Sequence, residues 1–423
     1  MELKPIDDGY KKTVAGVIPN DWSVRHMGEV ARVVSGQVDP TIKPYSLMPL
    51  VAPDHIESGS GRLASSIPTA EEQRAISGKY LFRSGTVIYS KIRPHLRKVC
   101  IAPFDGVCSA DMYPLLPADD VHPGFLFASL LSERFSKYAE SVSIRSGMPK
   151  INREELADFE FVLPSTRYEQ AQIALTLTDT DALIDSLEQL LTKKRQIKQG
   201  AMQELLTGKR RLPGFSQAWT LMHLGEIGRT YGGLTGKSKA DFGRGDARYV
   251  TFMNVMANVR TSAYALESVQ IASSESQNMV QPDDLLFNGS SETPEEVALC
   301  SWVESCEKNV FLNSFCFGFR PFVQDRISGL FMAYFFRARP GRNAVSSLAQ
   351  GATRYNIAKT ALLQASLKLP SFEEQKAIAE TLSSMDEELA ALESRLTKAR
   401  ALKQAMAQAL LTGRIRLVPG SAA

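Results

Sequence analysis

The sequence contains one long internal repeat, and this repeat constrains the fold more than any other feature. Residues 181–212 align with residues 386–417 at a constant offset of 205, with 16 identities in 32 positions. The same offset relates Glu169–Ala174 to Glu374–Ala379, and an LPS tripeptide precedes each of these segments. A chain built in this way is expected to fold as two similar halves, so each motif has to be interpreted twice.

Each copy of the repeat predicts one long helix. Thr166 and Ser371 begin capping boxes directly after a proline, and Gly208 and Gly413 supply the C-terminal stops. The enclosed segments of about 40 residues would form helices roughly 60 Å long.

Apolar residues at spacings of three and four give both helices a heptad seam. We expect six residues to pair the helices across it: Ile184, Leu187, Leu191, Leu389, Leu392 and Leu396. Beyond Leu191 and Ala399 the apolar spacing changes. The seam is therefore expected to shift to Ile197, Ala201 and Leu205 in the first helix and to Leu402, Met406 and Leu410 in the second. Such a shift would break strict heptads and change the supercoil locally.

The charges along the two helices indicate the direction of pairing. The first helix is acidic up to Glu188 and basic from Lys193, and the second changes from acidic to basic between Glu393 and Arg395. Antiparallel pairing lays each acidic half on a basic half, whereas parallel pairing places like charges together. We therefore predict one intramolecular antiparallel coiled coil with pseudo-two-fold symmetry. The alternative is two separate amphipathic helices whose charge follows the helix dipole.

The segments outside the repeat differ from each other, and each is large enough to form a domain. WSVRHMGEV near the start of the chain matches WTLMHLGEI in the second half, and stretches such as GTVIYSK and RYVTFMNV alternate like strands. The expected fold class is α+β, with two mixed α/β domains and two long helices that pair as an antiparallel coiled coil. The expected boundaries are 1–164 for the first domain, 165–212 for the central helix, 213–370 for the second domain, and 371–423 for the distal helix and tail.

Composition excludes several classes of protein. The 423 residues are 44% hydrophobic and 22% charged, which is ordinary for a globular protein and rules out disorder or a coiled coil alone. The longest apolar runs are only a few residues, and the N-terminus has no apolar stretch behind a basic start, so we expect a cytoplasmic protein without a membrane partner. The five cysteines lack C-x-x-C spacing and are expected to be reduced packing residues, with no metal site.

Catalytic motifs are missing from the sequence. It has no glycine-rich cofactor loop, no H-E-x-x-H, no G-x-S-x-G and none of the amino-methyltransferase motifs. GGLTGKS at 232–238 resembles a phosphate loop, but only three residues separate its glycines where that loop needs four. We therefore expect a chain that is not an enzyme by itself, without catalytic residues and without a bound cofactor.

Basic windows without acids occur in both halves and indicate contacts with nucleic acid. Residues 79–104 contain six bases and residues 326–372 contain seven. Two segments, 145–152 and 350–356, occupy equivalent places before the long helices, and each combines a glycine turn, a base and an asparagine. The expected DNA-binding residues are Lys91, Arg93, Arg97, Lys98, Arg145, Lys150, Asn152, Thr235, Lys237, Lys239, Arg354, Tyr355 and Asn356. The alternatives are a solvated basic face balanced by acids elsewhere and ordinary β-turns.

Several of these motifs together resemble the specificity subunit of Type I restriction-modification systems. They are IPNDWSVRHMGEV, GTVIYSKIRPHLRKV, SGMPKIN before LPSTRYEQAQIA, the LLTKKRQIKQGAMQELLTGKRRLPGF block, and their counterparts in the second half. The resemblance implies a non-catalytic reader of duplex DNA, in which each globular domain is a target recognition domain for one half of a bipartite, asymmetric site. It also implies that the paired helices hold the half-sites at a fixed separation and dock the partner subunits.

The partners implied by the resemblance carry the chemistry. Two modification subunits would bring S-adenosylmethionine and methylate adenine N6, and restriction subunits would add ATP-driven translocation and Mg²⁺-dependent cleavage. One alternative is a specificity chain of a Type IIB-like system, which would have the same features and a different neighbour gene. Others are a structural coiled-coil scaffold without affinity for DNA, and an ATPase in which Lys237 holds the nucleotide.

Overall fold

The computed structural model describes residues 9–144, 148–323, 325–351 and 354–417. Within these ranges, no helix is both long and apolar enough to cross a membrane.

The chain divides into two compact units. Unit 1 combines Met1–Glu188 with Ser394–Ala423, and unit 2 is Gln189–Glu393. The long helices α5 (Arg167–Leu205) and α11 (Phe372–Leu410) each contribute one half to each unit. This division falls inside the helices, whereas the boundaries expected from the sequence lie near their ends, and those boundaries stay a prediction.

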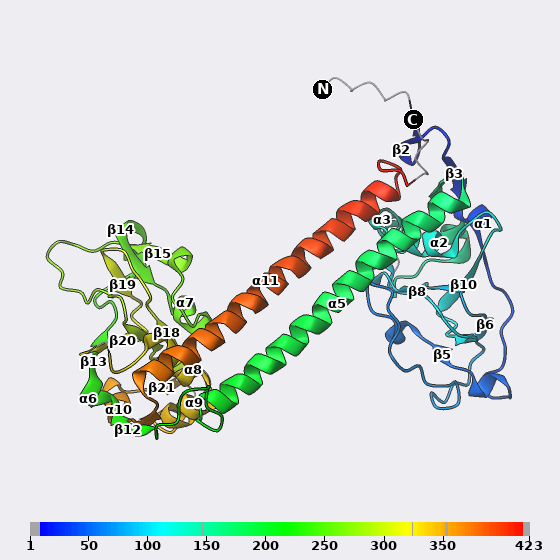
Figure 1. The fold of residues 1–423 in the computed structure, drawn as a ribbon. Coiled ribbons are helices and arrows are strands. Elements are labelled where there is room, and N and C mark those ends of the chain that lie inside the picture. Colours follow the sequence, from blue (N-terminus) through cyan, green and yellow to red (C-terminus); the bar gives the residue numbers. More distant parts are fainter. Residues whose placement is uncertain (1–8, 145–147, 324, 352–353, 418–423) are drawn as a thin grey trace. The chain divides into compact units, whose positions relative to one another are not determined.

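The globular part of unit 1 is built on two small sheets (Figure 1). The first is antiparallel, in the order β4 (Ala31–Val33), β10 (Met112–Pro117), β7 (Val87–Ser90) and β8 (Val99–Ile101). The second has the order β5 (Leu50–Val51), β9 (Gly106–Cys108) and β6 (Tyr80–Phe82), in which β5 and β9 are parallel. The remaining strands form the hairpin β1 (Tyr10–Thr13) and β2 (Gly16–Pro19) and the pair β3 (Ser23–His26) and β11 (Glu160–Leu163). The short helices are α1 (Met27–Val30), α2 (Pro123–Leu130), α3 (Glu133–Val142) and α4 (Arg153–Ala157).

Unit 2 likewise has one sheet of four strands and one of three. Its antiparallel sheet has the order β13 (Gly228–Gly232), β20 (Cys316–Pro321), β16 (Leu285–Asn288) and β18 (Cys300–Trp302). A second sheet has the order β15 (Leu266–Val269), β14 (Phe242–Val250) and β19 (Val310–Leu312), and β14 is parallel to β19 just as β5 is parallel to β9. Two short pairs are β12 (Thr220–His223) with β22 (Ser366–Leu369) and β17 (Ser290–Ser291) with β21 (Tyr355–Asn356). The short helices are α6 (Leu224–Ile227), α7 (Phe252–Ala257), α8 (Gly329–Arg337), α9 (Arg339–Ser346) and α10 (Lys359–Gln364).

The first turns of the long helices belong to the cores of the globular parts. Ile173 and Leu177 of α5 are buried in the same apolar cluster as Tyr89 and Phe135 of the first domain. Ile378 and Leu382 of α11 have the corresponding place in the core of unit 2. Burying two such side chains contributes several kcal/mol, so each helix is fixed to its domain by packing as well as by the chain.

The Glu–Gln dipeptide of the repeat connects each helix to its domain by hydrogen bonds. The Gln170 side chain accepts from the amide of His122 at 2.7 Å, and His122 is the N-cap of α2. The Gln375 side chain accepts in the same way from the amide of Ser328, the N-cap of α8, at 2.9 Å. Each glutamine therefore accepts a hydrogen bond from the backbone amide of an N-cap residue in the adjoining domain. This shared role explains why the dipeptide occurs in both halves.

The glutamates of this dipeptide are buried and pair with an arginine that follows the other long helix. In unit 1, Glu169 accepts from Arg416 at 2.6 Å and from the Trp22 indole at 3.2 Å. In unit 2, Glu374 accepts from Arg211, whose guanidinium lies over the Trp219 ring. The C-terminal segment thus completes the first domain in the way that the central segment completes the second.

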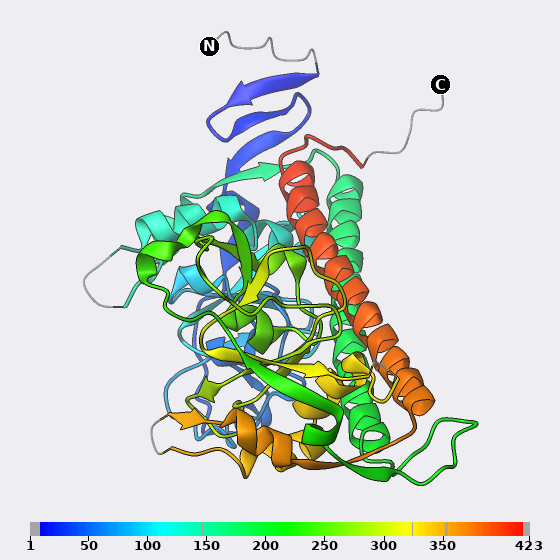
Figure 2. The same ribbon diagram turned by 90° about the vertical axis from the view of Figure 1, so that its left-hand side faces the viewer.

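The hairpin at the start of the chain also lies against this C-terminal segment. The Tyr10 hydroxyl donates to the Gly413 carbonyl at 3.1 Å, and Figure 2 shows the hairpin beside the end of α11. Gly413 has φ of 72° and lies so close to Pro19 that a side chain there would collide with the proline ring. Glycine is therefore needed at this stop for its conformation and for the close approach.

Within each unit, a segment of α5 lies antiparallel to a segment of α11, as the charge pattern predicts (Figures 1 and 2). In unit 1, Lys403 pairs with Asp181 at 2.5 Å and Arg400 pairs with Glu188 at 2.7 Å. The equivalent pairs in unit 2, displaced by 205 residues, are Lys198 with Asp386 and Arg195 with Glu393. Parallel helices could not make these pairs, so the antiparallel prediction and the pseudo-two-fold repeat are confirmed.

The seam follows the predicted positions in the middle of the helices and departs from them beyond. Four of the predicted pairing residues, Ile184, Leu187, Leu191 and Leu396, are buried, and Leu389 and Leu392 are half-buried.

The predicted shift of the seam is wrong at Ile197 and Leu402, which are 47% and 57% exposed, whereas Leu205 and Leu410 of the same predicted seam are buried. The heptad instead continues through the half-buried Lys194, Lys198 and Lys403, which reach acids on the opposite helix. A pattern of apolar residues misses these seam positions because a lysine covers apolar surface with its stem and keeps its charge at the rim.

Candidate nucleic-acid interface

The basic window of unit 1 lies on the connection from β7 to β8, and the fold brings a distant segment against it. The Arg93 amide donates to the Pro149 carbonyl at 2.8 Å, and the Ile151 amide donates to the Lys91 carbonyl at 2.9 Å. Lys91, Arg93 and Lys150, which two separate motifs supplied as candidates, therefore lie on adjoining strands of chain. We refer to 91–93 and 148–150 together as the basic loop pair.

The candidates in this region divide into two groups. In the described part of the chain, no acid pairs with Lys91, Arg93 or Lys150, and Arg93 and Lys150 are exposed. Arg97 instead donates to the Leu131 carbonyl, and Lys98 donates to the Pro53 carbonyl at 2.6 Å.

Arg97 and Lys98 each use one donor within the fold, and their contact with DNA stays a prediction. Both side chains are half-buried, and the Pro53 carbonyl also accepts from the Ile56 amide at 3.3 Å. Within the same window, Arg83 pairs with Asp105 at 2.7 Å, as a solvated surface charge does.

A tyrosine platform supports the basic loop pair. The Lys91 ammonium and the Arg153 guanidinium both lie 5.6 Å from the centre of the Tyr113 ring, and Arg153 also lies 5.8 Å from the Tyr80 ring. Burial raises the pKa of the Tyr113 phenol, with Arg153 acting in the opposite direction, so the ring stays neutral at physiological pH.

Arg153 is an exposed base beside the basic loop pair that sequence reasoning missed. The signal was its place in the first turn of α4, where a cation is opposed by the helix dipole and so indicates a tertiary role. Asn152, which was a candidate, accepts from the Glu155 amide at 2.8 Å and is the N-cap of α4. Its side chain is thus used locally, and Asn152 is corrected to a structural residue. Arg145 lies outside the described residues.

Unit 2 contains the equivalent of the basic loop pair with a different chemistry. Asn356 pairs with Ser290 and Tyr355 with Ser291 as β21 and β17, and the Ile357 amide donates to the Gly289 carbonyl at 3.1 Å, as Ile151 does to Lys91. The described parts of the two segments thus pair with their domains in the same way, while residues 145–147 and 352–353 lie outside the described residues. In unit 2, Gly289 and Ser291 occupy the positions of Lys91 and Arg93 in unit 1, so the first strand of this pair carries no basic residue at either position.

Arg354, Tyr355 and Asn356 occupy the rim of this second loop pair. The Arg354 guanidinium lies 5.7 Å from the centre of the Phe315 ring, and that ring is 59% exposed. Asn356 is exposed and Tyr355 is half-buried. An exposed cation on an exposed aromatic ring suits stacking on a base or contact with a phosphate.

The 235–239 loop gives one correction. Lys237 has a side chain only 4% exposed, and it pairs with Glu275 at 2.5 Å and donates to the Gln270 carbonyl at 2.6 Å. The hydrogen bond from Lys237 lowers the pKa of Glu275 to about 2. Lys237 therefore holds the loop together and is not available to a phosphate, of DNA or of a nucleotide.

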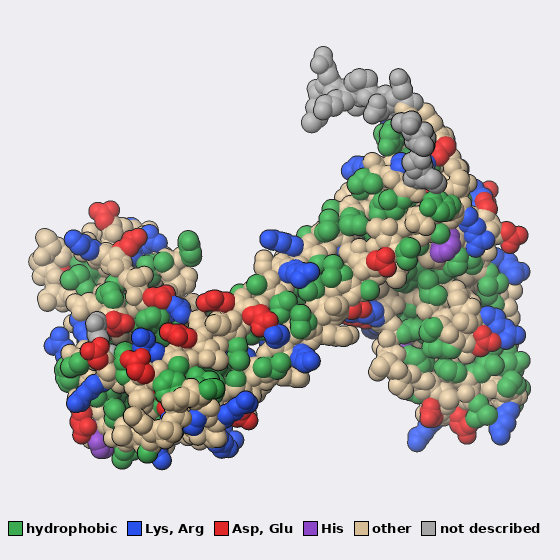
Figure 3. Space-filling view, viewed as in Figure 1, with side chains coloured by type: hydrophobic (Ala, Val, Ile, Leu, Met, Phe, Trp, Pro, Cys, Tyr) green, Lys and Arg blue, Asp and Glu red, His purple; other side chains and the backbone are tan. Residues whose placement is uncertain are grey.

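The other two candidates of this loop lie at its surface. Lys239 is exposed, and Thr235 is exposed with its amide donating to the Gln277 side chain at 3.1 Å. Acids and bases lie side by side on the face of unit 2 visible in Figure 3, so no strongly basic patch marks this face.

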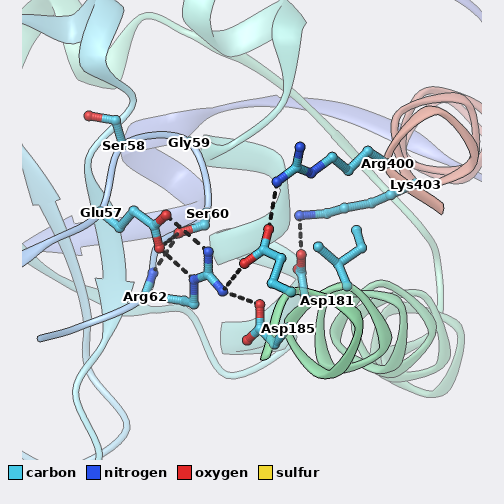
Figure 4. A pocket seen from close by; sticks show the side chains of 11 residues that line it. Glu57, Ser58, Gly59, Ser60, Arg62, Asp181, Asp185, Arg400 and Lys403 are labelled. Carbon is cyan, nitrogen blue, oxygen red and sulfur yellow. Dashed lines mark hydrogen bonds and ion pairs between the residues drawn. The ribbon is translucent and has the colours of Figure 1, made fainter. Parts of the chain in front are cut away.

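A charged pocket of about 260 Å³ lies between the 57–62 loop and the long helices of unit 1. Figure 4 shows Arg62 in its centre, directed toward Glu57 and Asp185. Arg62 pairs with Glu57 at 2.5 Å and with Glu188 at 3.2 Å, and Arg400 pairs with Glu188 from the other side. These ion pairs join the 57–62 loop to α5 and to α11 within unit 1.

The described part of the chain contains no group of three or more His, Cys, Asp or Glu side chains placed to hold a metal ion. Four cysteines are buried, and burial raises the pKa of the Cys100 and Cys316 thiols to about 12. These thiols are protonated packing groups, as expected from their spacing.

The family model and the relatives found by comparison with known proteins agree on one family. The model of the family described as "Type I restriction modification DNA specificity domain" matches residues 19–199 and 217–399, one match in each half of the chain. The chain is 40% identical to the specificity subunit of the Type I restriction enzyme EcoDI of Escherichia coli over 171 residues, which are 40% of this chain and 37% of that protein. It is 21% identical to the specificity subunit of the Type I restriction enzyme MjaVIII of Methanocaldococcus jannaschii, over 97% of both chains.

Solved structures have the same fold. The HsdS subunit from Thermoanaerobacter tengcongensis matches with a TM-score of 0.53 at 20% identity, over 94% of this chain and 98% of that one. The S subunit of a Type I restriction-modification system from M. genitalium matches with a TM-score of 0.56 at 15% identity, over 92% of this chain and 96% of that one. The α+β class with two repeated domains is thereby confirmed.

Proposed function

Because the chain belongs to the family of Type I restriction-modification DNA specificity domains, we propose that it is the subunit that selects the DNA site for a methyltransferase and endonuclease complex. The observation that carries the proposal is the family match in both halves of the repeat, 19–199 and 217–399. As a specificity subunit the chain is not itself an enzyme, and catalysis belongs to the subunits that it joins.

Each globular part reads one half of a bipartite, asymmetric site in duplex DNA. Lys91, Arg93 and Lys150, which have no acidic partner among the residues that the structure describes, support this role for unit 1, since cations on adjoining segments are what phosphate and base contacts require. Arg354 on Phe315, with Asn356 beside it, supports it for unit 2. The different chemistry of the two loop pairs favours different half-sites and therefore an asymmetric target.

The long helices dock two modification subunits and set the separation of the half-sites. Apolar side chains away from the seam support docking: Leu175 and Leu183 of α5 in unit 1 are 53% and 45% exposed, and Ile197 in unit 2 is 47% exposed. Figure 3 shows hydrophobic side chains at the surface of the helices on the visible face. Exposed leucines at helical spacing favour burial against partner helices.

The partner subunits supply the cofactors. S-adenosylmethionine belongs to the modification subunits, and ATP and Mg²⁺ belong to the restriction subunits. The present chain contributes the position of the complex on DNA, which is a matter of binding free energy and needs none of these groups.

Mapping of methylated adenine tests the proposal. Genomic DNA from a host with the complete system should carry N6-methyladenine at one bipartite motif, and deletion of this gene alone should abolish it. Replacing 213–370 with the equivalent domain of a relative should change one half of the motif and keep the other half. Retention of the methylated motif without the gene would overturn the proposal, and an exchange that altered both halves would show that the domains do not read separately.

A further inference from the structure

We propose that Arg93 reads a guanine in the first half-site, while Lys91 and Lys150 hold the neighbouring phosphates. The inference rests on the proposed function. It assigns separate roles to the three basic residues of the basic loop pair that have no acidic partner in the described part of the chain. It names a base in the target, which neither the family nor the sequence pattern specifies.

The backbone holds Arg93 in a defined place. Its amide donates to the Pro149 carbonyl at 2.8 Å, and its carbonyl accepts from the Leu96 amide at 2.9 Å. Its φ of 49° is left-handed, a conformation that costs a non-glycine residue free energy and persists only where the surroundings impose it. Residues in such conformations are concentrated at functional sites. Position 93 is an arginine and not a glycine or asparagine, which adopt a left-handed conformation at lower cost.

The neighbours of Arg93 act as anchors for the turn. Arg97, also left-handed with φ of 48°, donates to the Leu131 carbonyl, and Lys98 donates to the Pro53 carbonyl at 2.6 Å. The turn Pro94–Leu96 between the two arginines is thus tied to the domain on its C-terminal side, while the Lys150 segment ties it on the other. The basic residues Arg97 and Lys98 thus hold the turn. The exposed Arg93 has no acidic partner in the described part of the chain.

The chemistry of the free bases differs. A guanidinium is a planar fork that donates two parallel hydrogen bonds and matches the O6 and N7 acceptors of guanine in the major groove. An ammonium is a point charge that suits a phosphate oxygen equally in any sequence context. Lys91 on the Tyr113 ring and the exposed Lys150 flank Arg93, which is the arrangement that lets phosphates position the fork.

The fixed turn adds discrimination. An arginine whose backbone is fixed loses less backbone entropy when it binds a base. A different base at that position then costs the free energy of the hydrogen bonds that cannot form. A mobile arginine would instead move to the nearest phosphate.

The test uses the complex of the chain with its modification subunits and compares Arg93→Lys, Lys150→Gln and Arg83→Lys. Binding to a library of duplexes that carries every base at each position of the wild-type motif is measured at several salt concentrations, together with the methylated motif. Arg83 is the matched control, because it is exposed, paired with Asp105, and lies in the same basic window outside the turn.

We expect Arg93→Lys to reduce the preference for guanine at one position of the first half-site by roughly ten- to a hundredfold, with the second half-site unchanged. Lys150→Gln should weaken binding to all duplexes and reduce the salt slope by about one, and Arg83→Lys should have no effect. If Arg93→Lys keeps the full preference, or weakens all duplexes equally, Arg93 is not a base reader. A wild-type complex that shows no sequence preference would instead refute the proposed function itself.

Discussion

At the scale of single residues, burial decides whether a lysine or arginine side chain is available to DNA. Lys237 and Lys239 are two positions apart in one loop, yet the Lys237 ammonium is enclosed with Glu275 while Lys239 is exposed. The same contrast separates Arg97 from Arg93 in unit 1. A basic window therefore contains residues that hold the loop and residues that can bind, and the sequence does not distinguish them.

We predict that Lys237→Gln lowers the unfolding temperature and raises the pKa of Glu275 from about 2 toward its ordinary value of 4.5. A carboxyl whose pKa is lower in the folded state contributes stability above its unfolded pKa and loses it as the pH falls toward the folded pKa. The difference in stability between wild type and variant should therefore be present at pH 7 and shrink from about pH 4.5 to pH 2. Thermal unfolding across this range measures it.

The matched variant is Lys239→Gln, which should leave the unfolding temperature unchanged and reduce the salt slope of DNA binding. Equal unfolding temperatures for the two variants would contradict the structural role of Lys237. A reduced salt slope for Lys237→Gln alone would restore it as a DNA contact.

At the scale of elements, the two long helices keep one heptad register on both sides of their middle. The seam continues from Leu191 through Lys194 and Lys198, and Lys403 has the position equivalent to Lys198. Ion pairs with Asp386 and Asp181 satisfy these lysines, so the register does not depend on apolar residues alone. An uninterrupted heptad register means that the pair can be lengthened by whole heptads without rotating either face.

We predict that inserting seven residues after Leu191 together with seven after the equivalent Leu396 widens the gap between the half-sites by about three base pairs. Each residue adds about 1.5 Å and each base pair of DNA about 3.4 Å, so the added length is roughly 10 Å. Both half-sequences should stay the same in the map of methylated adenine.

The control is the insertion after Leu191 alone, which displaces Lys198 from Asp386 and Arg195 from Glu393 and should lower stability and activity. If the double insertion is fully active with an unchanged gap, the helices are not what sets the separation. The partner subunits would then determine it.

At the scale of the whole molecule, unit 1 is completed by residues from both ends of the chain. Arg416 pairs with the fully buried Glu169 at 2.6 Å and with Asp21 at 2.8 Å, and its guanidinium lies 5.5 Å from the centre of the Trp22 ring. Burial acts to raise the pKa of Asp21, but the hydrogen bonds from Arg416 and Ser165 outweigh it and lower that pKa. The first domain is therefore closed by the tail just as Arg211 closes the second.

We predict that Arg416→Ala lowers the free energy of unfolding of the chain by about 2 to 3 kcal/mol, since it leaves the Glu169 carboxylate buried without its charged partner. Denaturant unfolding measures this effect. Arg414→Ala, which removes an exposed arginine two residues away, should change the free energy by less than about 0.5 kcal/mol. Equal effects of the two variants would show that the tail does not complete unit 1.

The sequence by itself determined the repeat, the two helices, their antiparallel pairing and the family. Helix caps, heptads and charge gradients are local patterns, and each can be identified from residues three or four positions apart. The acidic and basic halves of α5 and α11 could match in only one direction, and the pair of Asp181 with Lys403 agrees with that direction.

Only the tertiary structure decided which bases are free and which are enclosed. Lys91 and Lys150 are far apart in the chain and adjoin because backbone hydrogen bonds join their segments, while Lys237 is removed from solvent by a glutamate on another loop. A seam that runs through Lys198 is visible only when the acid on the facing helix is known. The physical reason is the same in each case: the solvation of a charge depends on groups distant in the sequence, and no local pattern contains them.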